Sequence, residues 1–259
     1  MTSKADPGGF PQRRVADVPA VTGAQMREIQ RAAQEEYGLD ILQIMENSGR
    51  AIATLVLAML GGRGRGQRVV VLAGGGNKGG SGLCAVRHIQ NWGLTVEPVF
   101  GEVESEMSLP ARRQLDVLRR SGIVEPRDQE TSEVTLEEHL ARADLVIDAL
   151  AGYGQEGPPT GIAAAIVELA VASRRPILAI DVPTGVNATT GVVSSPAIKA
   201  TTTIFLDLPK RGLLDPGCRE FVGELYLADV GIPHAVHERY GGVSAGGLFS
   251  EGPIIRLRR

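Results

Sequence analysis

The chain has 259 residues, of which 43% are hydrophobic and 22% are charged, and this composition is typical of a globular protein with an ample core. Its formal net charge of −3 gives no electrostatic case for binding nucleic acid. No apolar run approaches the roughly 20 residues that cross a bilayer, and the first residues, MTSKADPGGFPQRR, lack the apolar core of a signal peptide, so we expect no membrane partner.

The two cysteines, Cys84 and Cys218, indicate the compartment. Two thiols cannot form a disulfide framework, so we expect both to be reduced and the protein to be cytoplasmic. Along the chain we expect a disordered lead-in over residues 1–20, one domain over residues 21–233, and a C-terminal tail over residues 234–259. The arginines of the final IIRLRR are typical of a solvated chain end.

The first predicted elements are two helices. Thr22 and Gln25 fit a capping box at the start of one helix, and a second helix is predicted over about residues 40–60, ended by GGRGRGQ. The next segment, RVVVLA, is short and continuously apolar, which is typical of a strand buried on both faces. The glycine-rich loop AGGGNKGGSG follows this strand and leads into a helix that reaches about Trp92.

The rest of the chain alternates between strands and helices. LTVEPVF is a strand whose Pro98 indicates an edge position or an early end. A helix over about residues 109–120, the strand DLVIDAL, the helix TGIAAAIVELAVAS and the strand PILAID come next, and TTTIFLDL and GELYLADV are two further strands. This alternation predicts an α/β fold with a parallel sheet covered by helices on both faces.

Three of these strands end in loops that carry chemistry. VVVLA ends at Ala73 before the glycine-rich loop, LVIDAL carries Asp148 before AGYGQEGPPTG, and ILAID ends at Asp181 before VPTGVNATTG. Ligands bind beyond the carboxyl ends of the strands in such sheets. We therefore expect the glycine-rich loop and the two carboxylates to meet in one crevice.

The individual signals are weaker than their combination. Gly74, Gly76 and Gly79 fit the dinucleotide pattern G-x-G-x-x-G, but no acidic residue is decisively placed for a ribose, and the P-loop pattern is absent. An aspartate after a strand is most often a turn or cap residue. The hydroxyl of Thr184, with carboxylates and carbonyls, would suit a hard cation and equally a sugar or an amide. Tyr153 could stack on a flat ligand.

Six motifs in order resemble the YjeF N-terminal domain family, whose enzymatic members are NAD(P)H-hydrate epimerases. MENSG is similar to the family's MENAG and GNKGGSGL to its GNNGGDGL, and the later segments DLVIDALAGYG, AIDVPTGVNATTG, PKRGLLDPG and GELYLADVGIP follow the family pattern. The likeness spans about Val21 to Pro233. It implies a three-layer α/β/α sandwich with a Rossmann-like, mostly parallel sheet, a metabolite-repair activity that interconverts the R and S forms of hydrated NADH and NADPH, a bound potassium ion, and a homodimer.

The resemblance also implies the site residues. Asp181 would be the catalytic carboxylate, and Asp148 and Thr184 would be potassium ligands. The residues that would line the nucleotide-like substrate are Asn77, Lys78, Gly79, Gly80, Ser81, Gly152, Tyr153, Gly154, Gln155, Glu156, Gly157, Pro158 and Asp181.

Two residues depart from the family pattern. Ser81 stands where the family has an acid, and Lys78 stands where it has an asparagine ligand of potassium. A lysine here either turns to solvent or places its ammonium among the oxygens that would hold the ion, and we predict the second arrangement, with Asp148 and Thr184 as acceptors.

Three functions stay open. The first is an epimerase of hydrated NAD(P)H, or of a related nucleotide-like ligand, with an altered site and no need of potassium. The second is a catalytically degenerate YjeF-type domain that binds a ligand or a protein partner. The third, an NAD(P) oxidoreductase, leaves the other motifs unexplained.

Overall fold

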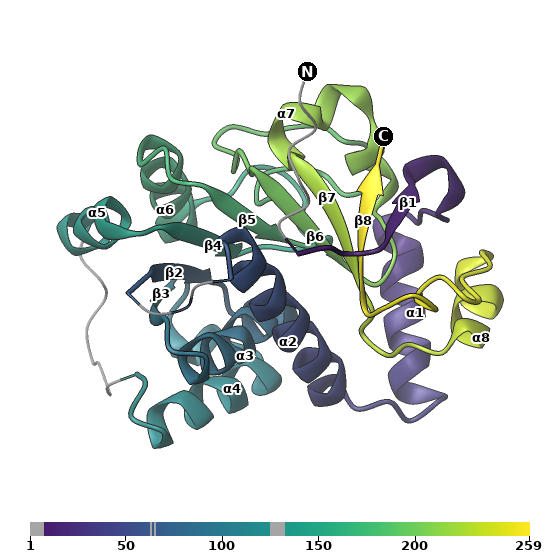
Figure 1. Ribbon diagram of the computed structural model, residues 1–259, viewed down its shortest axis with the longest axis horizontal. Helices are drawn as coiled ribbons and strands as arrows, with labels where there is room; N and C mark the ends of the chain where they lie inside the picture. The colour runs from purple at the N-terminus through teal and green to yellow at the C-terminus, as the bar shows by residue number, and fades with distance from the viewer. Residues whose placement is uncertain (1–7, 63, 65, 125–132) are drawn as a thin grey trace.

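In the part of the chain that the structure describes, the fold is built on one twisted sheet of eight strands (Figure 1). The computed structural model describes residues 8–62, 64, 66–124 and 133–259. The strands lie in the order β1-β8-β7-β6-β5-β4-β2-β3, and every neighbouring pair is parallel except β7 and β8. Their bounds are β1 Gln12–Arg14, β2 Arg68–Ala73, β3 Thr95–Phe100, β4 Leu145–Ala149, β5 Ile177–Ile180, β6 Thr202–Leu206, β7 Glu224–Ala228 and β8 Ile254–Arg258.

Helices cover both faces of this sheet. The α-helices are α1 Gly23–Glu35, α2 Ile41–Met59, α3 Asn77–Asn91, α4 Leu109–Arg120, α5 Glu133–Arg142, α6 Gly161–Ala172, α7 Arg219–Val222 and α8 His234–Val236. Short turns of other helix types lie at η1 Val15–Asp17, η2 Glu104–Glu106, η3 Arg211–Leu214, η4 Pro216–Cys218 and η5 His237–Gly241.

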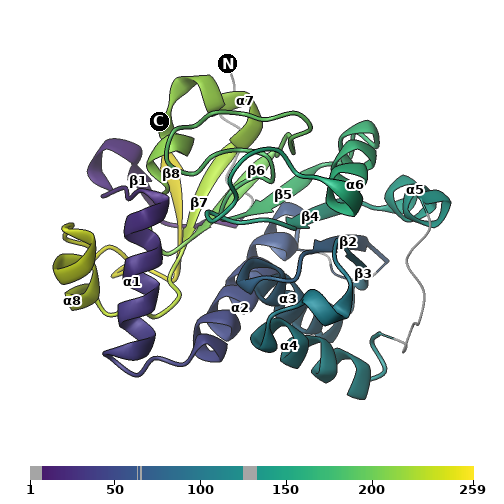
Figure 2. The same ribbon diagram turned by 180° about the vertical axis from the view of Figure 1, so that it is seen from behind.

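The core is divided between the two faces by the alternation of side chains along each strand. In β2, Val69 and Val71 pack in the larger cluster with α1, α2, α3 and α4, whereas Val70 and Leu72 pack in a second cluster with α5 and α6. Figures 1 and 2 show these two helix groups on opposite sides of the sheet. The predicted three-layer α/β/α sandwich is confirmed.

Local signals explain where the first elements begin and end. The capping box of Thr22 and Gln25 is present at α1, and Asp40 and Gln43 form another at α2. Pro98 lies in β3, which is a strand at the edge of the sheet, as the proline predicted. None of the described helices is both long and apolar enough to cross a membrane.

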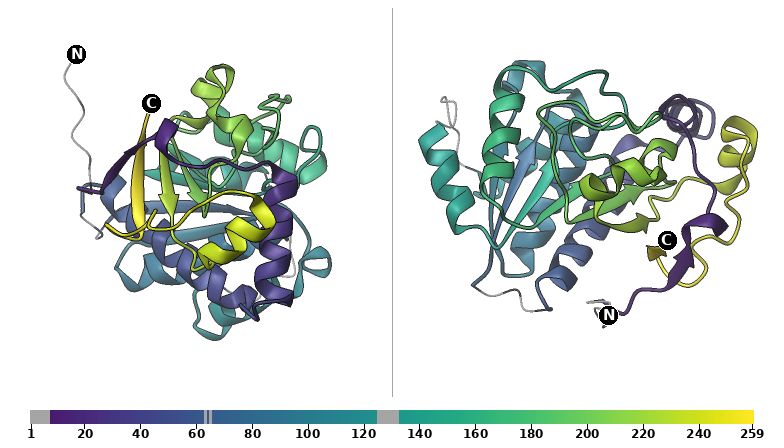
Figure 3. Two further views of the ribbon diagram at one scale, coloured as in Figure 1. Left: turned by 90° about the vertical axis from the view of Figure 1, so that its right-hand side faces the viewer. Right: turned by 90° about the horizontal axis from the view of Figure 1, so that it is seen from above.

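The ends of the domain differ from the expectation. Within the lead-in predicted over residues 1–20, residues 12–14 form β1, and within the tail predicted over residues 234–259, residues 254–258 form β8, which lies between β1 and β7 (Figure 3). Residues 1–7 lie outside the described residues. The arginines of this segment led to the wrong expectation of a solvated chain end, because Ile254, Ile255 and Leu257 are buried in the main core. This apolar half of the segment is the reason why it adds a strand.

The strand order reverses between β2 and β4. From β2 the chain moves outward to β3, and it then returns to place β4 on the opposite side of β2. The carboxyl ends of β2 and β4 therefore flank a topological switch point, the position at which ligands bind in open α/β sheets. The glycine-rich loop and Asp148 occupy this switch point.

Candidate active site

The glycine-rich loop is a tight connection between β2 and α3. A Cβ on Gly79 would lie 1.7 Å from the carbonyl oxygen of Gly74, and one on Gly74 would lie 2.0 Å from that of Leu150. These two glycines are thus required by close packing of backbone on backbone. Gly76, the residue before α3, has open space where a Cβ would be. The described residues include no side chain that caps α3 there, so its first amide groups remain free to face an anion.

Lys78 lies in the first turn of α3 and turns inward. Its side chain is only 6% exposed, and its Nζ donates to Asp148 Oδ2 at 3.1 Å and to the carbonyl oxygens of Ala151 and Val182 at 2.7 Å each. These partners come from the ends of β4 and β5. The Lys78 ammonium therefore joins three segments that sequence places far apart, and the expected ion pair with Asp148 is present.

The expected bond from Lys78 to Thr184 is not formed. The Thr184 hydroxyl donates instead to Asp148 Oδ1 at 2.7 Å, and it accepts the Ala151 N–H at 3.1 Å. Because the hydroxyl is committed in both directions, two backbone carbonyls complete the shell around the ammonium. The prediction was wrong in this detail, since backbone acceptors cannot be seen in a side-chain pattern.

Asp148 is fully buried and receives hydrogen bonds from every side. Besides Lys78 and the Thr184 hydroxyl, the backbone N–H groups of Leu150 and Thr184 donate to it. A carboxyl group surrounded only by donors is ionised. Its charge opposes the burial that lowers the pKa of Lys78. The three oxygens around Nζ accept only, so the nitrogen donates to all of them, which requires the protonated ammonium.

Asp181 follows β5 in a left-handed conformation, with φ of 64°. Such a φ costs a residue other than glycine about 1–3 kcal/mol and is often stored at functional positions. Its Oδ1 accepts from Lys210 Nζ at 2.5 Å and from the Leu206 N–H at 3.1 Å. Within the described residues Oδ2 has no hydrogen-bond partner. Asp181 thus presents one oxygen that is free to act on a ligand.

Asp181 and Asp148 lie at the same edge of the sheet, as expected. The backbone carbonyl that follows Asp181, that of Val182, binds the same ammonium as Asp148. The charge of Asp181 also acts to raise the pKa of Lys78, which requires the two groups to be close. The loops after β2, β4 and β5 therefore meet in one place.

Lys210 is a site residue that the sequence reasoning missed. It is fully buried, and besides Asp181 it donates to the carbonyl oxygens of Leu206 and Leu208 at 2.9 and 3.0 Å. Its ammonium also lies 5.7 Å from the centre of the Tyr153 ring, within cation–π range. The available signal was a lysine directly after an apolar strand, in TTTIFLDLPK.

The loop after β4 enters the site only with its first residues. Tyr153 donates from its hydroxyl to Gln30 Oε1 at 2.5 Å, and burial together with Asp181 raises its pKa. The side chain of Gln155 accepts from the Gly185 N–H at 3.0 Å. A Cβ on Gly152 would lie 3.5 Å from that of Lys78. Of the predicted site residues in this loop, Gly154, Glu156, Gly157 and Pro158 are exposed.

The remaining predicted residues all lie in the first turns of α3. Asn77 is exposed, whereas Gly79, Gly80 and Ser81 are buried. A Cβ on Gly80 would lie 2.7 Å from Met45 Cε, so this glycine lets α2 approach. The described structure thus places Asn77 at the surface beside the open position of Gly76 and Ser81 one turn deeper.

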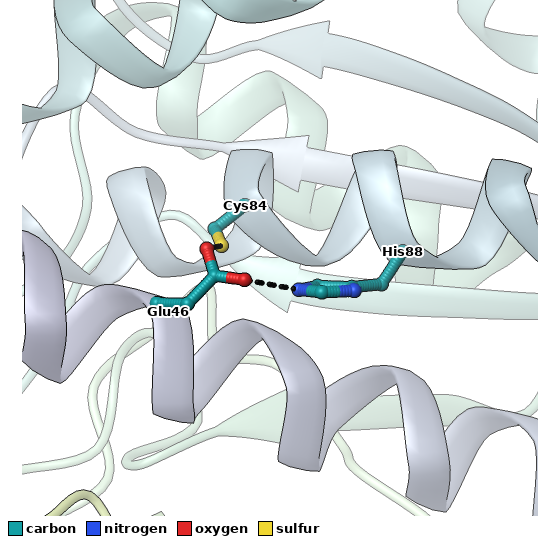
Figure 4. A group of neighbouring side chains, drawn as sticks. All are labelled: Glu46, Cys84 and His88. Atoms are coloured by element: carbon teal, nitrogen blue, oxygen red, sulfur yellow. Dashed lines mark hydrogen bonds and ion pairs between the residues drawn. The ribbon is translucent and has the colours of Figure 1, made fainter.

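A second polar cluster lies between α2 and α3 (Figure 4). Glu46 Oε1 is 3.0 Å from His88 Nε2, and the Cys84 thiol donates to Glu46 Oε2 at 3.4 Å. The three could present metal-ligand atoms within 4.8 Å of one another. The Arg87 guanidinium, however, also contacts Glu46 and Cys84. Burial raises the pKa of Cys84 to about 12, which keeps it a neutral thiol.

This cluster therefore stabilises helix packing. A Cβ on Gly49 would lie 2.6 Å from Cys84 Sγ, so the glycine of MENSG allows the two helices to approach closely. Cys84 and Cys218 are free and buried. His88 is 5% exposed and contacts Glu46 of the neighbouring helix.

Comparisons with known proteins agree with this arrangement. The profile of the family described as YjeF-related protein N-terminus matches residues 41–212. The NAD(P)H-hydrate epimerase of Dehalogenimonas lykanthroporepellens is 40% identical over 242 residues, 93% of both chains. The bifunctional NAD(P)H-hydrate repair enzyme Nnr of Moorella thermoacetica is 33% identical over 82% of this chain, which spans only 40% of that enzyme.

A solved structure shares the fold. The crystal structure of the yeast protein YNL200c has a TM-score of 0.76, with 24% identity, and the match covers 93% of this chain and all of the yeast chain. Together with the matched family profile and the relatives above, it leads to one conclusion: the chain belongs to the family of YjeF-related protein N-termini.

Proposed function

We propose that the protein is an NAD(P)H-hydrate epimerase, which interconverts the R and S forms of hydrated NADH and NADPH. The observation that carries the proposal is Asp181, a buried carboxylate at the end of β5, beside the switch point of the sheet, with one oxygen that has no hydrogen-bond partner among the described residues. The similarity to a relative named NAD(P)H-hydrate epimerase supports the choice of substrate.

The chemistry needs one group that gives and takes a proton. The hydrate carries a hydroxyl on a carbon bonded to the ring nitrogen. In one route the Asp181 carboxylate first takes a proton from solvent on Oδ2 and gives it to that hydroxyl, the C–O bond breaks, and water departs as the nitrogen lone pair forms an iminium. Water then adds to the opposite face and returns a proton to the carboxylate, so atoms and charge balance.

The surroundings of Asp181 suit this role. The carboxylate forms as the cationic iminium forms, so opposite charges arise side by side. Lys210 binds Oδ1 and so fixes the orientation of the carboxylate, which makes it a positioning residue. Ring opening is a second route to inversion, and it needs the same proton transfers at oxygen.

The start of α3 supports a nucleotide-like ligand. Its first amide groups are not capped by a described side chain, and Gly76 leaves the approach open. The positive end of the helix dipole at this point favours an anion such as a phosphate.

Two residues favour a second candidate function. Ser81 and Lys78 replace an acid and an asparagine of the family pattern, in the loop nearest the proposed ligand. A domain that has lost turnover and retains ligand or protein binding would tolerate both changes. The fold and the open start of α3 serve that function equally well.

One experiment separates these functions. The purified protein is mixed with one epimer of hydrated NADH, and the approach to the equilibrium mixture is followed by chromatography. Turnover supports the epimerase, and saturable binding without turnover supports the binding module. Hydride transfer to or from intact NAD(P) would support an oxidoreductase and refute both.

Assembly and compartment are proposals taken from the family resemblance and the cysteines. We propose a homodimer in the cytoplasm that acts in metabolite repair. Light scattering after size exclusion gives the mass directly, and a value near 27.4 kDa would contradict the dimer.

A further inference from the structure

We propose that the Lys78 ammonium is a tethered monovalent cation, which takes the place of a bound potassium ion and makes this protein independent of potassium. The proposal concerns the same site as the proposed function. It rests on that function only in the experiments that measure epimerase activity. Its structural part, the filling of an oxygen cage by the chain's own side chain, stands apart from the reaction.

The shell around Lys78 has the composition of a cation cage. The carboxylate of Asp148 and the carbonyls of Ala151 and Val182 point at one nitrogen from 2.7 to 3.1 Å. Oxygens of these kinds bind hard cations in proteins. An ammonium has three N–H donors, one for each oxygen. The cage is thus completely satisfied by Lys78.

A potassium ion does not fit beside this ammonium. The two carbonyl oxygens and Asp148 Oδ2 already face Nζ, and Asp148 Oδ1 is committed to the Thr184 hydroxyl and the Leu150 N–H. The Thr184 oxygen itself accepts the Ala151 N–H. A potassium ion bound to the same oxygens would lie close to the Lys78 ammonium and would be repelled by its charge.

The tether has a structural consequence for the crevice. Lys78 is the second residue of α3, and its partners follow β4 and β5. The ammonium therefore fixes the start of α3 against the two loops that carry Asp148 and Asp181. A free ion would dissociate from such a cage, whereas a covalently attached ammonium keeps the loops joined in any salt.

The first measurement is made on the unaltered protein. Thermal unfolding is recorded in potassium chloride and in tetramethylammonium chloride at equal ionic strength, because the larger ion cannot enter the cage. The two melting temperatures should agree within about 1 °C, since a cation that does not bind the folded state does not stabilise it. A saturable rise in potassium would overturn the proposal.

The second measurement opens the cage. Lys78→Asn removes the ammonium and leaves Asp148 buried without its partner, so its melting temperature in tetramethylammonium should fall by roughly 5–15 °C. Potassium or ammonium chloride should recover several degrees of this loss in a saturable way. Lys78→Met retains the apolar volume without an oxygen ligand. Lys199→Asn removes an exposed lysine paired with Glu220 and reports the general effect of salt.

The outcomes are distinct. Recovery of Lys78→Asn by potassium no greater than that of Lys78→Met and Lys199→Asn would overturn the proposal. If Lys78→Asn folds in none of these salts, the melting temperature of the unaltered protein with and without potassium tests the proposal. If the unaltered protein turns over hydrated NADH, its rate should be equal in both salts. Absence of turnover with the predicted melting behaviour would refute the proposed function and leave the tethered cation standing.

Discussion

Replacing Asp148 by asparagine tests the buried ion pair at the centre of the site. Asparagine keeps the shape of the side chain but removes its charge. Its amide oxygen can replace Oδ2, which receives Lys78 and the Thr184 N–H. The amide nitrogen then takes the position of Oδ1, where the Leu150 N–H loses its acceptor. With the amide turned the other way, its nitrogen would take the position of Oδ2 and would face two donors, the Lys78 ammonium and the Thr184 N–H. That orientation is less favourable.

The size of the effect has an upper bound set by Lys78. Removing one partner of a buried pair costs about 3–5 kcal/mol. Lys78 can escape this cost by losing its proton, and from its ordinary pKa of 10.5 that takes 10.5 − 7 = 3.5 pH units, or about 5 kcal/mol at pH 7. The two figures agree. We expect Asp148→Asn to lower the free energy of unfolding by about 3–5 kcal/mol at pH 7.

The pH dependence follows with a definite sign. If Lys78 is neutral in the folded variant and charged in the unfolded chain, the unfolded state binds one more proton, so stability rises with pH. The deficit relative to the unaltered protein should shrink by up to about 1.4 kcal/mol per pH unit until the pH reaches the unfolded pKa near 10.5.

Urea unfolding at pH 7 and pH 9 measures both quantities. Asp17→Asn, which removes an exposed carboxylate paired with Arg14, is the control and should leave the midpoint unchanged. A loss of less than about 1 kcal/mol for Asp148→Asn at pH 7, or a deficit that grows with pH, would refute the buried ion pair.

Three further predictions concern the neighbouring residues. Asp181→Asn should abolish epimerisation and keep the fold, because the amide cannot carry the proton; turnover at the unaltered rate would assign the proton to another group. Lys210→Met should lower the free energy of unfolding by about 3–5 kcal/mol, since it strands the buried Asp181 carboxylate, and a change below about 1 kcal/mol in urea unfolding would contradict the pair. Gly79→Ala should lower the melting temperature sharply, because its Cβ would lie 1.7 Å from the Gly74 oxygen, whereas Gly76→Ala, with open space around it, should not; equal melting temperatures would refute the packing argument.

Much of the fold follows from local signals in the sequence. The capping box at Thr22 and the continuous apolar runs of β2, β4 and β5 each act over a few residues, so they can be recognised without knowing the fold. The order of the strands and the placement of β1 and β8 are different. They depend on contacts between residues 12–14 and 254–258, more than 200 residues apart, and no local pattern reports such a contact.

The candidate site divides in the same way. The meeting of Lys78, Asp148 and Asp181 could be predicted, because parallel strands place their carboxyl ends at one edge. The contacts of Lys78 with the carbonyl oxygens of Ala151 and Val182 could not be predicted, since every residue has a backbone carbonyl. Lys210 was missed because its burial depends on the path of the chain after β6. That path brings the lysine into contact with Asp181 at the end of β5.

The central claim is tested most directly by starting from the pure R epimer of hydrated NADH in potassium-free buffer. Chromatography then follows the appearance of the S epimer with the unaltered protein, with Asp181→Asn, and with buffer alone. We predict that the unaltered protein brings the mixture to equilibrium and that Asp181→Asn proceeds only at the rate in buffer. An unaltered protein that proceeds no faster than buffer, with or without added potassium, would contradict this prediction.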